Sequence, residues 1–94
     1  MLAGLTYDAA ERLVFRDGQS TRLRELEAKA FSRIIARYPG YVPPAQLYDA
    51  MYGNQDRSPN CLRVHVCTLN KRLAALGVRV VGYPGRGYLL EATA

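Results

Sequence analysis

The fold is decided by Asn60-Cys-Leu-Arg-Val-His-Val-Cys-Thr-Leu-Asn-Lys-Arg-Leu-Ala-Ala-Leu76, followed after one glycine by Val78-Arg-Val-Val-Gly-Tyr-Pro-Gly-Arg-Gly-Tyr-Leu-Leu90. At about 100° per residue, apolar side chains of the first segment share one side of a helix. They are Leu62, Val66, Leu69, Leu73 and Leu76. The pattern predicts a helix over residues 60–76 that ends at Gly77, and then a hairpin over residues 78–91.

The opposite side of this helix carries the candidate binding residues. They are Asn60, Arg63, Val64, Cys67, Thr68, Asn70 and Lys71. Val64 is an apolar residue among polar neighbours, and an apolar side chain there can contact a thymine methyl group. The hairpin turns through Pro84-Gly85-Arg86-Gly87, so that Arg86 is the one long cationic side chain at its tip. A polar, basic helix face beside an arginine-tipped hairpin is typical of a surface that contacts nucleic acid.

The rest of the chain predicts a small antiparallel sheet and two further helices. Short strand-forming runs lie within residues 5–23, with a hairpin turn at Asp17-Gly18. Apolar residues at helical spacing predict a helix over residues 25–38, which Pro39-Gly40 ends. A shorter helix is expected over about residues 44–52, since proline is tolerated in a first helical turn. The expected fold class is α+β.

Length and charge narrow the class of partner. The 94 residues predict a single domain, residues 1–94, with a net charge of +5 and a pI of about 9.6. Residues 1–53 carry a net charge of +1, and residues 54–94 carry +4. The positive excess therefore lies with the last helix and the hairpin, which favours nucleic acid as partner. A few solvated arginines would give the same composition, so composition alone leaves both interpretations open.

Other chemistry is disfavoured. The chain has one histidine, no nucleophile and base at catalytic spacing and no glycine-rich phosphate loop, so neither an enzyme nor a cofactor is expected. Cys61 and His65 could reach one metal ion, but two ligands make a poor zinc site. Cys61 and Cys67 cannot pair from positions six apart on a helix, which favours a reduced, cytoplasmic protein. No apolar run suits a membrane helix or a signal peptide.

Several fragments occur along the chain in an order and spacing shared with a known family. Residues 23–27 read Leu-Arg-Glu-Leu-Glu where that family has Leu-Thr-x-x-Glu, and residues 64–73 correspond to its Val-His-Ile-x-x-Leu-Arg-x-Lys-Leu. Residues 84–88 read Pro-Gly-Arg-Gly-Tyr where it has Arg-Gly-x-Gly-Tyr. Between the first two of these fragments, Pro39-Gly40 corresponds to the family's Pro-Gly break, Leu47 to the leucine of its second helix, and Tyr52-Gly53 to the Trp-Gly-like end of that helix. Over about residues 12–91 the chain resembles the OmpR/PhoB-type winged-helix effector domain of bacterial response regulators.

This resemblance implies a winged helix-turn-helix and sequence-specific binding of double-stranded DNA by a transcriptional regulator. The helix over residues 60–76 would lie in the major groove. There Arg63 could take guanine, Asn70 could take adenine, and Val64 could contact a thymine methyl. Lys71 would meet phosphate, and Arg86 would enter the adjacent minor groove.

The chain departs from the family pattern in ways that make its contact chemistry less cationic. Asn70 and Pro84 stand where the family has arginine, and several members also carry arginines where this chain has Cys67 and Thr68. Arg24 replaces the threonine of the first-helix motif. The target DNA sequence therefore cannot be transferred from the family. The family's N-terminal receiver domain does not fit in this sequence, so a stand-alone regulator is expected, with an excised effector domain as the alternative.

Partners other than DNA follow from the same resemblance. The loop formed by Asn54, Gln55, Asp56 and Arg57 lies where related domains contact RNA polymerase, although an ordinary polar connector is the simpler interpretation. One small module binds a short site weakly, so specific control is expected to need either two copies on repeated half-sites, direct or inverted, or a partner protein. The alternative function is a protein-interaction module of the same fold, in which the chain's seven tyrosines supply contact surface.

Overall fold

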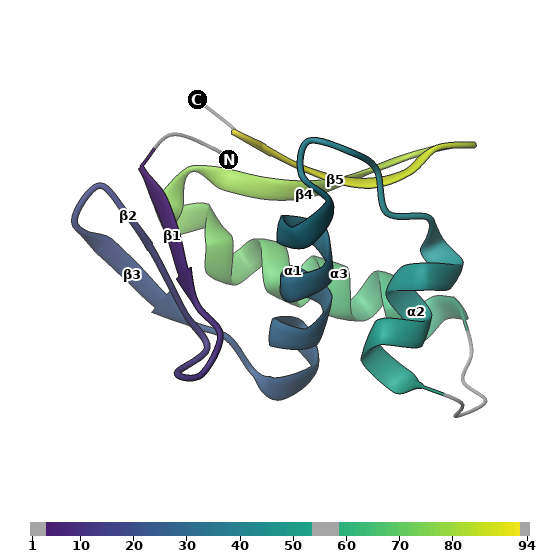
Figure 1. Ribbon diagram of the computed structural model, residues 1–94, viewed down its shortest axis with the longest axis horizontal. Coiled ribbons are helices and arrows are strands. Elements are labelled where there is room, and N and C mark those ends of the chain that lie inside the picture. The colour runs from purple at the N-terminus through teal and green to yellow at the C-terminus, as the bar shows by residue number, and fades with distance from the viewer. Residues whose placement is uncertain (1–3, 54–58, 93–94) are drawn as a thin grey trace.

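In the part of the chain that the structure describes, three helices combine with two small antiparallel sheets. A computed structural model describes residues 4–53 and 59–92, without the side chains of residues 59–62. In chain order the elements are β1 (Leu5–Asp8), β2 (Leu13–Arg16), β3 (Gln19–Arg22), α1 (Glu25–Arg37), α2 (Pro44–Tyr52), α3 (Pro59–Leu73), the 3-10 turn η1 (Ala74–Leu76), β4 (Val78–Tyr83) and β5 (Gly87–Ala92). In Figure 1 the sheet β1–β3 lies at one end, α2 at the other, and β4–β5 runs above the helices. The expected α+β winged-helix class is confirmed.

The predicted elements are present with small shifts at their ends. The first helix ends at Arg37, one residue before the expected end at residue 38. The helix expected over residues 60–76 is α-helical only from Pro59 to Leu73, and its last turn tightens into η1. Helices often end in such a 3-10 turn, because the tighter turn satisfies carbonyls that lack an i+4 partner.

The N-terminal sheet is a three-stranded meander in the order β1-β2-β3. Its second turn is the expected one, because Arg16 pairs with Gln19 around Asp17 and Gly18, which have φ of +51° and +80°. Positive φ at both central residues matches the twist of a tight hairpin. One face of the sheet packs on α1, where the Tyr7 hydroxyl lies 2.8 Å from Ser32 Oγ. This contact fixes the sheet against the first helix.

The core lies where the three helices and both sheets meet. Fully buried side chains come from every layer: Val14, Leu23, Phe31, Ile34, Val42, Leu47, Leu69, Leu73, Val78 and Leu90. The apolar side predicted for the last helix is inside, since Val66 and Leu76 are also buried. Burying a side chain of this kind stabilises the fold by about 1.5–3 kcal/mol. The apolar face of α3 is thus buried wherever its side chains are described, while the side chain of Leu62 lies outside the described residues, and the opposite face is left to solvent.

Glu27 joins the start of α1 to α3. Its carboxylate is almost fully buried, and Oε1 accepts a 3.0 Å hydrogen bond from the backbone N–H of Arg24, one of the amides that a helix start leaves unpaired. The same oxygen lies 2.6 Å from Arg72 Nε of α3. That N–H does not point along the contact, so the interaction is ionic rather than a directed hydrogen bond. One carboxylate therefore both caps α1 and holds α3.

The hairpin β4–β5 is tied to the segment before α2. Val42 and Tyr88 exchange two backbone hydrogen bonds of 2.9 and 2.8 Å, which form a bridge outside the named strands. Gly87, beside this bridge, has a φ of +128°, and a Cβ there would overlap the backbone of Val42. Only glycine allows both this conformation and this close approach. The hairpin base is consequently held against the helix-turn-helix.

Replacing Gly87 should therefore cost far more stability than replacing a neighbouring glycine. We expect Gly87→Ala to lower the free energy of unfolding by about 3 kcal/mol, because it combines backbone strain with overlap at Val42. The control is Gly85→Ala, where φ is +77° but nothing lies within 4 Å, so only about 1 kcal/mol should be lost. Urea unfolding of both variants measures the difference. Equal losses would show that the Val42 contact is loose.

Removal of the buried carboxylate should also be costly. We expect Glu27→Ala to lower the free energy of unfolding by about 3 kcal/mol, because it leaves Arg72 without its counter-ion and the Arg24 amide without its acceptor. Glu27→Gln should lose less, since its amide oxygen can still accept from Arg24. Thermal unfolding compares the two, with exposed Glu25→Ala as control. A Glu27→Ala variant as stable as Glu25→Ala would contradict the role given to the carboxylate.

Candidate nucleic-acid interface

The outward face of α3 presents most of the side chains predicted to bind. Arg63, Val64, Cys67 and Lys71 are exposed, and Val64 is the most exposed large apolar residue of the described part at 59%. Thr68 lies between them, half-buried, and its Oγ1 donates a 3.0 Å hydrogen bond to the carbonyl of His65. The face mixes cations with apolar and weakly polar groups. Such a mixture can meet both phosphates and base edges.

Asn70 has a different role from the one predicted. Its Nδ2 donates a 3.0 Å hydrogen bond to the Val80 carbonyl, and its Oδ1 accepts a 2.7 Å hydrogen bond from the Val80 N–H. A bidentate contact with adenine needs these same two atoms. The prediction that Asn70 reads adenine is therefore wrong for this arrangement. Asn70 instead fastens α3 to β4, because β4 pairs with β5 on only one side and leaves the Val80 backbone groups open.

His65 is a packing residue on the flank of α3. It is half-buried, and its ring centroid lies 5.9 Å from that of Tyr52. The sequence suggested Cys61 as a metal partner, but the side chain of Cys61 lies outside the described residues. Within the described ranges, no group of three or more His, Cys, Asp or Glu side chains is placed to hold a metal ion. Asn60 and the loop Asn54, Gln55, Asp56 and Arg57 also lie outside what the structure describes.

A groove separates the N-terminal end of α3 from the hairpin tip. It is lined by Pro43, Pro44 and Arg63 on one side and by the hairpin residues 82–88 on the other. Arg86 is exposed, and its guanidinium carbon lies 5.8 Å above the ring centroid of Tyr41. Tyr41 in turn packs edge-on against Tyr83, with ring centroids 5.6 Å apart. The aromatic pair restricts the flexible arginine, a contact that the sequence did not predict.

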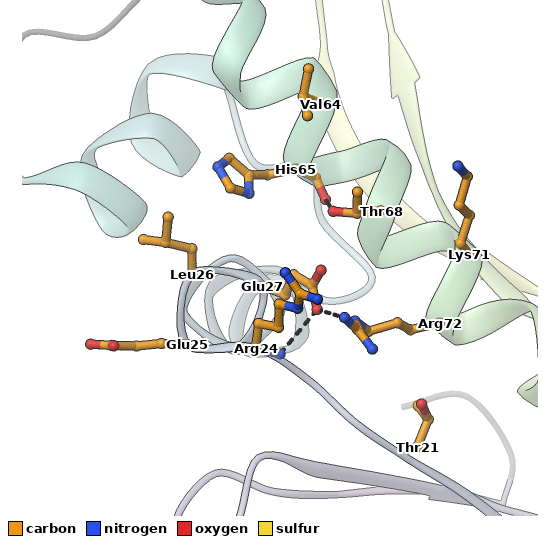
Figure 2. A pocket seen from close by; sticks show the side chains of 10 residues that line it. All are labelled: Thr21, Arg24, Glu25, Leu26, Glu27, Val64, His65, Thr68, Lys71 and Arg72. Carbon is orange, nitrogen blue, oxygen red and sulfur yellow. Dashed lines mark hydrogen bonds and ion pairs between the residues drawn. The ribbon is translucent and has the colours of Figure 1, made fainter.

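A second groove lies between α3 and the start of α1 (Figure 2). Its lining includes Arg24, Thr68, Lys71 and Arg72, together with the exposed Val64. Figure 2 shows Arg24 rising from the start of α1 on the side facing α3, with Glu27 between α1 and Arg72. Arg24 appeared in the sequence only as a departure from a family motif. Its sequence neighbours, which include Arg22 and the carboxylates Glu25 and Glu27, gave no sign that it lies beside the binding face.

Solved structures with the same arrangement are DNA-binding domains. The DNA-binding domain of Escherichia coli CadC superposes with a TM-score of 0.81 at 14% identity, covering 98% of this chain and 90% of that one. The DNA-binding domain of the response regulator AdeR, solved in complex with an intercistronic region, gives 0.81 at 21% identity, covering 98% of each chain. The chain has the OmpR/PhoB-type winged-helix fold. The resemblance expected from the sequence is thereby confirmed for the fold.

Curated relatives extend the likeness to sequence. The chain is 38% identical over 88 residues to the transcriptional regulatory protein CutR of Streptomyces coelicolor, and equally to CutR of Streptomyces lividans. The match covers 92% of this chain but 40% of CutR, so the chain spans less than half the length of these relatives. No protein-family model matches the chain. In the described ranges, no helix is long and apolar enough to cross a membrane.

The structural role of Asn70 yields a test that separates it from base reading. We expect Asn70→Ala to lower the free energy of unfolding by about 2 kcal/mol, because two hydrogen bonds to β4 are lost. Cys67→Ala, on the exposed face nearby, should change it by less than about 0.5 kcal/mol. Urea unfolding measures both. The structural role would be contradicted if Asn70→Ala kept full stability but lost a preference for adenine at one position of a selected DNA site. That result would support the original prediction that Asn70 reads adenine.

Proposed function

We propose that this chain is the DNA-binding domain of a bacterial transcriptional regulator, and that it recognises specific double-stranded sequences. The observation that carries the proposal is the outward face of α3, whose apolar side is buried and whose exposed side lies between two grooves lined with arginine. The likeness to CutR, a transcriptional regulatory protein, and to an AdeR domain in complex with DNA supports it. A chromosomal target agrees with the cytoplasmic location expected from the sequence.

Helix α3 would enter the major groove with its exposed face. Arg63 and Val64 are both exposed; Arg63 would take guanine through O6 and N7, and Val64 would lie against a thymine methyl. Lys71 meets phosphate, while Cys67 and Thr68 offer a small, weakly polar surface to the bases between. With Asn70 engaged on β4, base reading falls chiefly on Arg63, Val64 and Thr68, together with Asn60 at the helix start.

Arg86 would contact the neighbouring minor groove or its edge. The Arg86 side chain is already restricted by its contact with the Tyr41 ring before DNA binds. It therefore loses less conformational entropy on binding. A guanidinium in a narrow minor groove is attracted by concentrated negative potential. Pro84 and Gly85 are exposed beside it, so the tip can approach the duplex closely.

A non-catalytic role agrees with the likeness to CutR, a transcriptional regulatory protein, and to the DNA-binding domain of CadC. The proposal includes a second copy on a repeated half-site and contact with RNA polymerase through residues 54–57. A protein-interaction module of the same fold, with little DNA binding, is the rival proposal. It differs in one measurable property, because phosphate contacts release counterions and make affinity fall steeply with salt.

The proposal predicts salt-dependent binding that depends on two arginines. We expect the chain to bind a pool of random duplexes, followed by fluorescence anisotropy, and selection to enrich one motif. Arg63→Ala should weaken binding to that motif by about 5- to 150-fold, because a bidentate base contact is worth about 1–3 kcal/mol. Arg86→Ala should weaken binding to all sequences similarly and make the dependence on salt shallower.

The matched control is Arg37→Ala, which removes an exposed arginine at the far end of α1. It should leave DNA affinity within about twofold of the parent, as surface changes away from an interface usually do. Absence of binding by the parent chain even at low salt would overturn the DNA proposal and leave the protein-interaction module. Tight binding without an enriched motif would refute the proposed sequence specificity, while the proposal that the chain binds DNA would still stand.

A further inference from the structure

Four arginines from three parts of the chain meet at the junction of β3 and α1. A concavity there is lined by Arg12, Arg22, Arg24 and Arg72, with Leu23 and Glu25. These four arginines are called the junction cluster below. Arg24 and Arg72 also line the groove that runs along α3 to Thr68 and Lys71. The junction cluster is therefore continuous with the face of α3 that is proposed to bind DNA.

The junction cluster carries more positive charge than its carboxylates neutralise. Arg72 is matched by Glu27 at 2.6 Å, and Arg22 lies 3.8 Å from Glu11 in a pair that is well exposed. Arg12 and Arg24 have no carboxylate within ion-pair distance among the described residues. Neighbouring Glu25 faces Lys29 at 3.7 Å. Several cations held around one concavity repel one another unless an anion joins them.

The chemistry of Arg24 suits a phosphate oxygen. Its side chain is exposed, and it rises toward α3 at the edge of the groove (Figure 2). A planar guanidinium can donate two parallel hydrogen bonds to one phosphate. The resembled family has an uncharged threonine at the position of Arg24. This chain therefore gains a cation beside α3. On α3 itself it has Asn70 where the resembled family pattern has arginine, and Cys67 and Thr68 where several members of that family have arginines.

The two cationic sites lie at opposite ends of the exposed face of α3. Arg63 and Arg86 line the groove at its N-terminal end, and Lys71 and Arg24 line the groove at its C-terminal end. Eight residues separate Arg63 from Lys71, which is about 12 Å along a helix axis. The major groove of B-DNA is also about 12 Å wide and has a phosphate backbone on each side. Cations at both ends of α3 thus match phosphates at both edges of one groove.

We propose that the junction cluster is a second backbone-binding site, in which Arg24 binds a DNA phosphate on the side of the major groove away from the hairpin. The inference rests on the proposed function, since it needs α3 in the major groove. Contacts of this kind set the register and orientation of the helix and carry no sequence information. Such phosphate contacts add affinity beyond what the side chains of α3 supply, and α3 has fewer cations than the resembled family pattern.

The test compares Arg24→Ala with Arg33→Ala, an exposed arginine about 13 Å further along α1 by the rise of 1.5 Å per residue. Each variant loses one positive charge, so a difference between them reports position rather than net charge. Arg24→Thr is the second variant, because threonine can cap the helix and should not reduce its stability. The probe is a labelled random-sequence duplex, titrated at several salt concentrations, with thermal unfolding of each variant beside it.

We expect both Arg24 variants to reduce the slope of log affinity against log salt by about 0.9, the value for one lost phosphate contact. Arg33→Ala should keep the parent slope, and ethylation interference on a duplex carrying the selected motif should lose one phosphate in both Arg24 variants and none in Arg33→Ala. If the Arg24 variants keep the parent slope while Arg86→Ala lowers it, the second site is refuted and DNA binding stands. If the parent does not bind the duplex at low salt, the proposed function fails first.

Discussion

The position of α3 depends on one buried carboxylate. Among the described residues, Glu27 is the only buried side chain of the charged types Asp, Glu, Lys and Arg, and one of its oxygens meets both the Arg24 amide and Arg72. A charge withdrawn from water must keep its counter-ion, because an unpaired buried charge is far less stable than a paired one. Helix α3 therefore cannot slide or turn relative to α1 without exposing this carboxylate. Apolar packing alone would tolerate several such arrangements.

Further backbone contacts extend this constraint to the hairpin. Asn70 joins α3 to β4, and the bridge between Val42 and Tyr88 joins β5 to the segment before α2. The surfaces that present Arg63, Arg86 and Arg24 are thus parts of one connected framework. Binding groups that are already in place lose less entropy when a ligand arrives. A small domain with few cations on α3 can gain affinity in this way.

Local patterns allowed the elements to be predicted, but not their mutual contacts. Apolar spacing along residues 60–76 and the turn at Asp17-Gly18 depend on neighbours in sequence, so both were predicted correctly. The partner of Asn70 lies ten residues further on, in a strand whose open edge exists only in the folded chain. Arg24 lies beside α3 because β3, α1 and α3 converge. Nothing in the sequence around Arg24 indicates that these three elements converge. The role of Asn60 stays a prediction, because its side chain lies outside the described residues.

The hairpin tip differs sharply from its base in how much change it can accept. Gly87 is wedged against Val42, whereas Gly85, two residues away, has open space around it. Evolution or an engineer could therefore exchange residues 84–86 as a cassette, without disturbing the framework that carries it. If the domain binds DNA as proposed, such exchanges would change its preferences at the minor groove and leave its contacts in the major groove as they are. The fold thus separates the residues that preserve its shape from those that can diversify its targets.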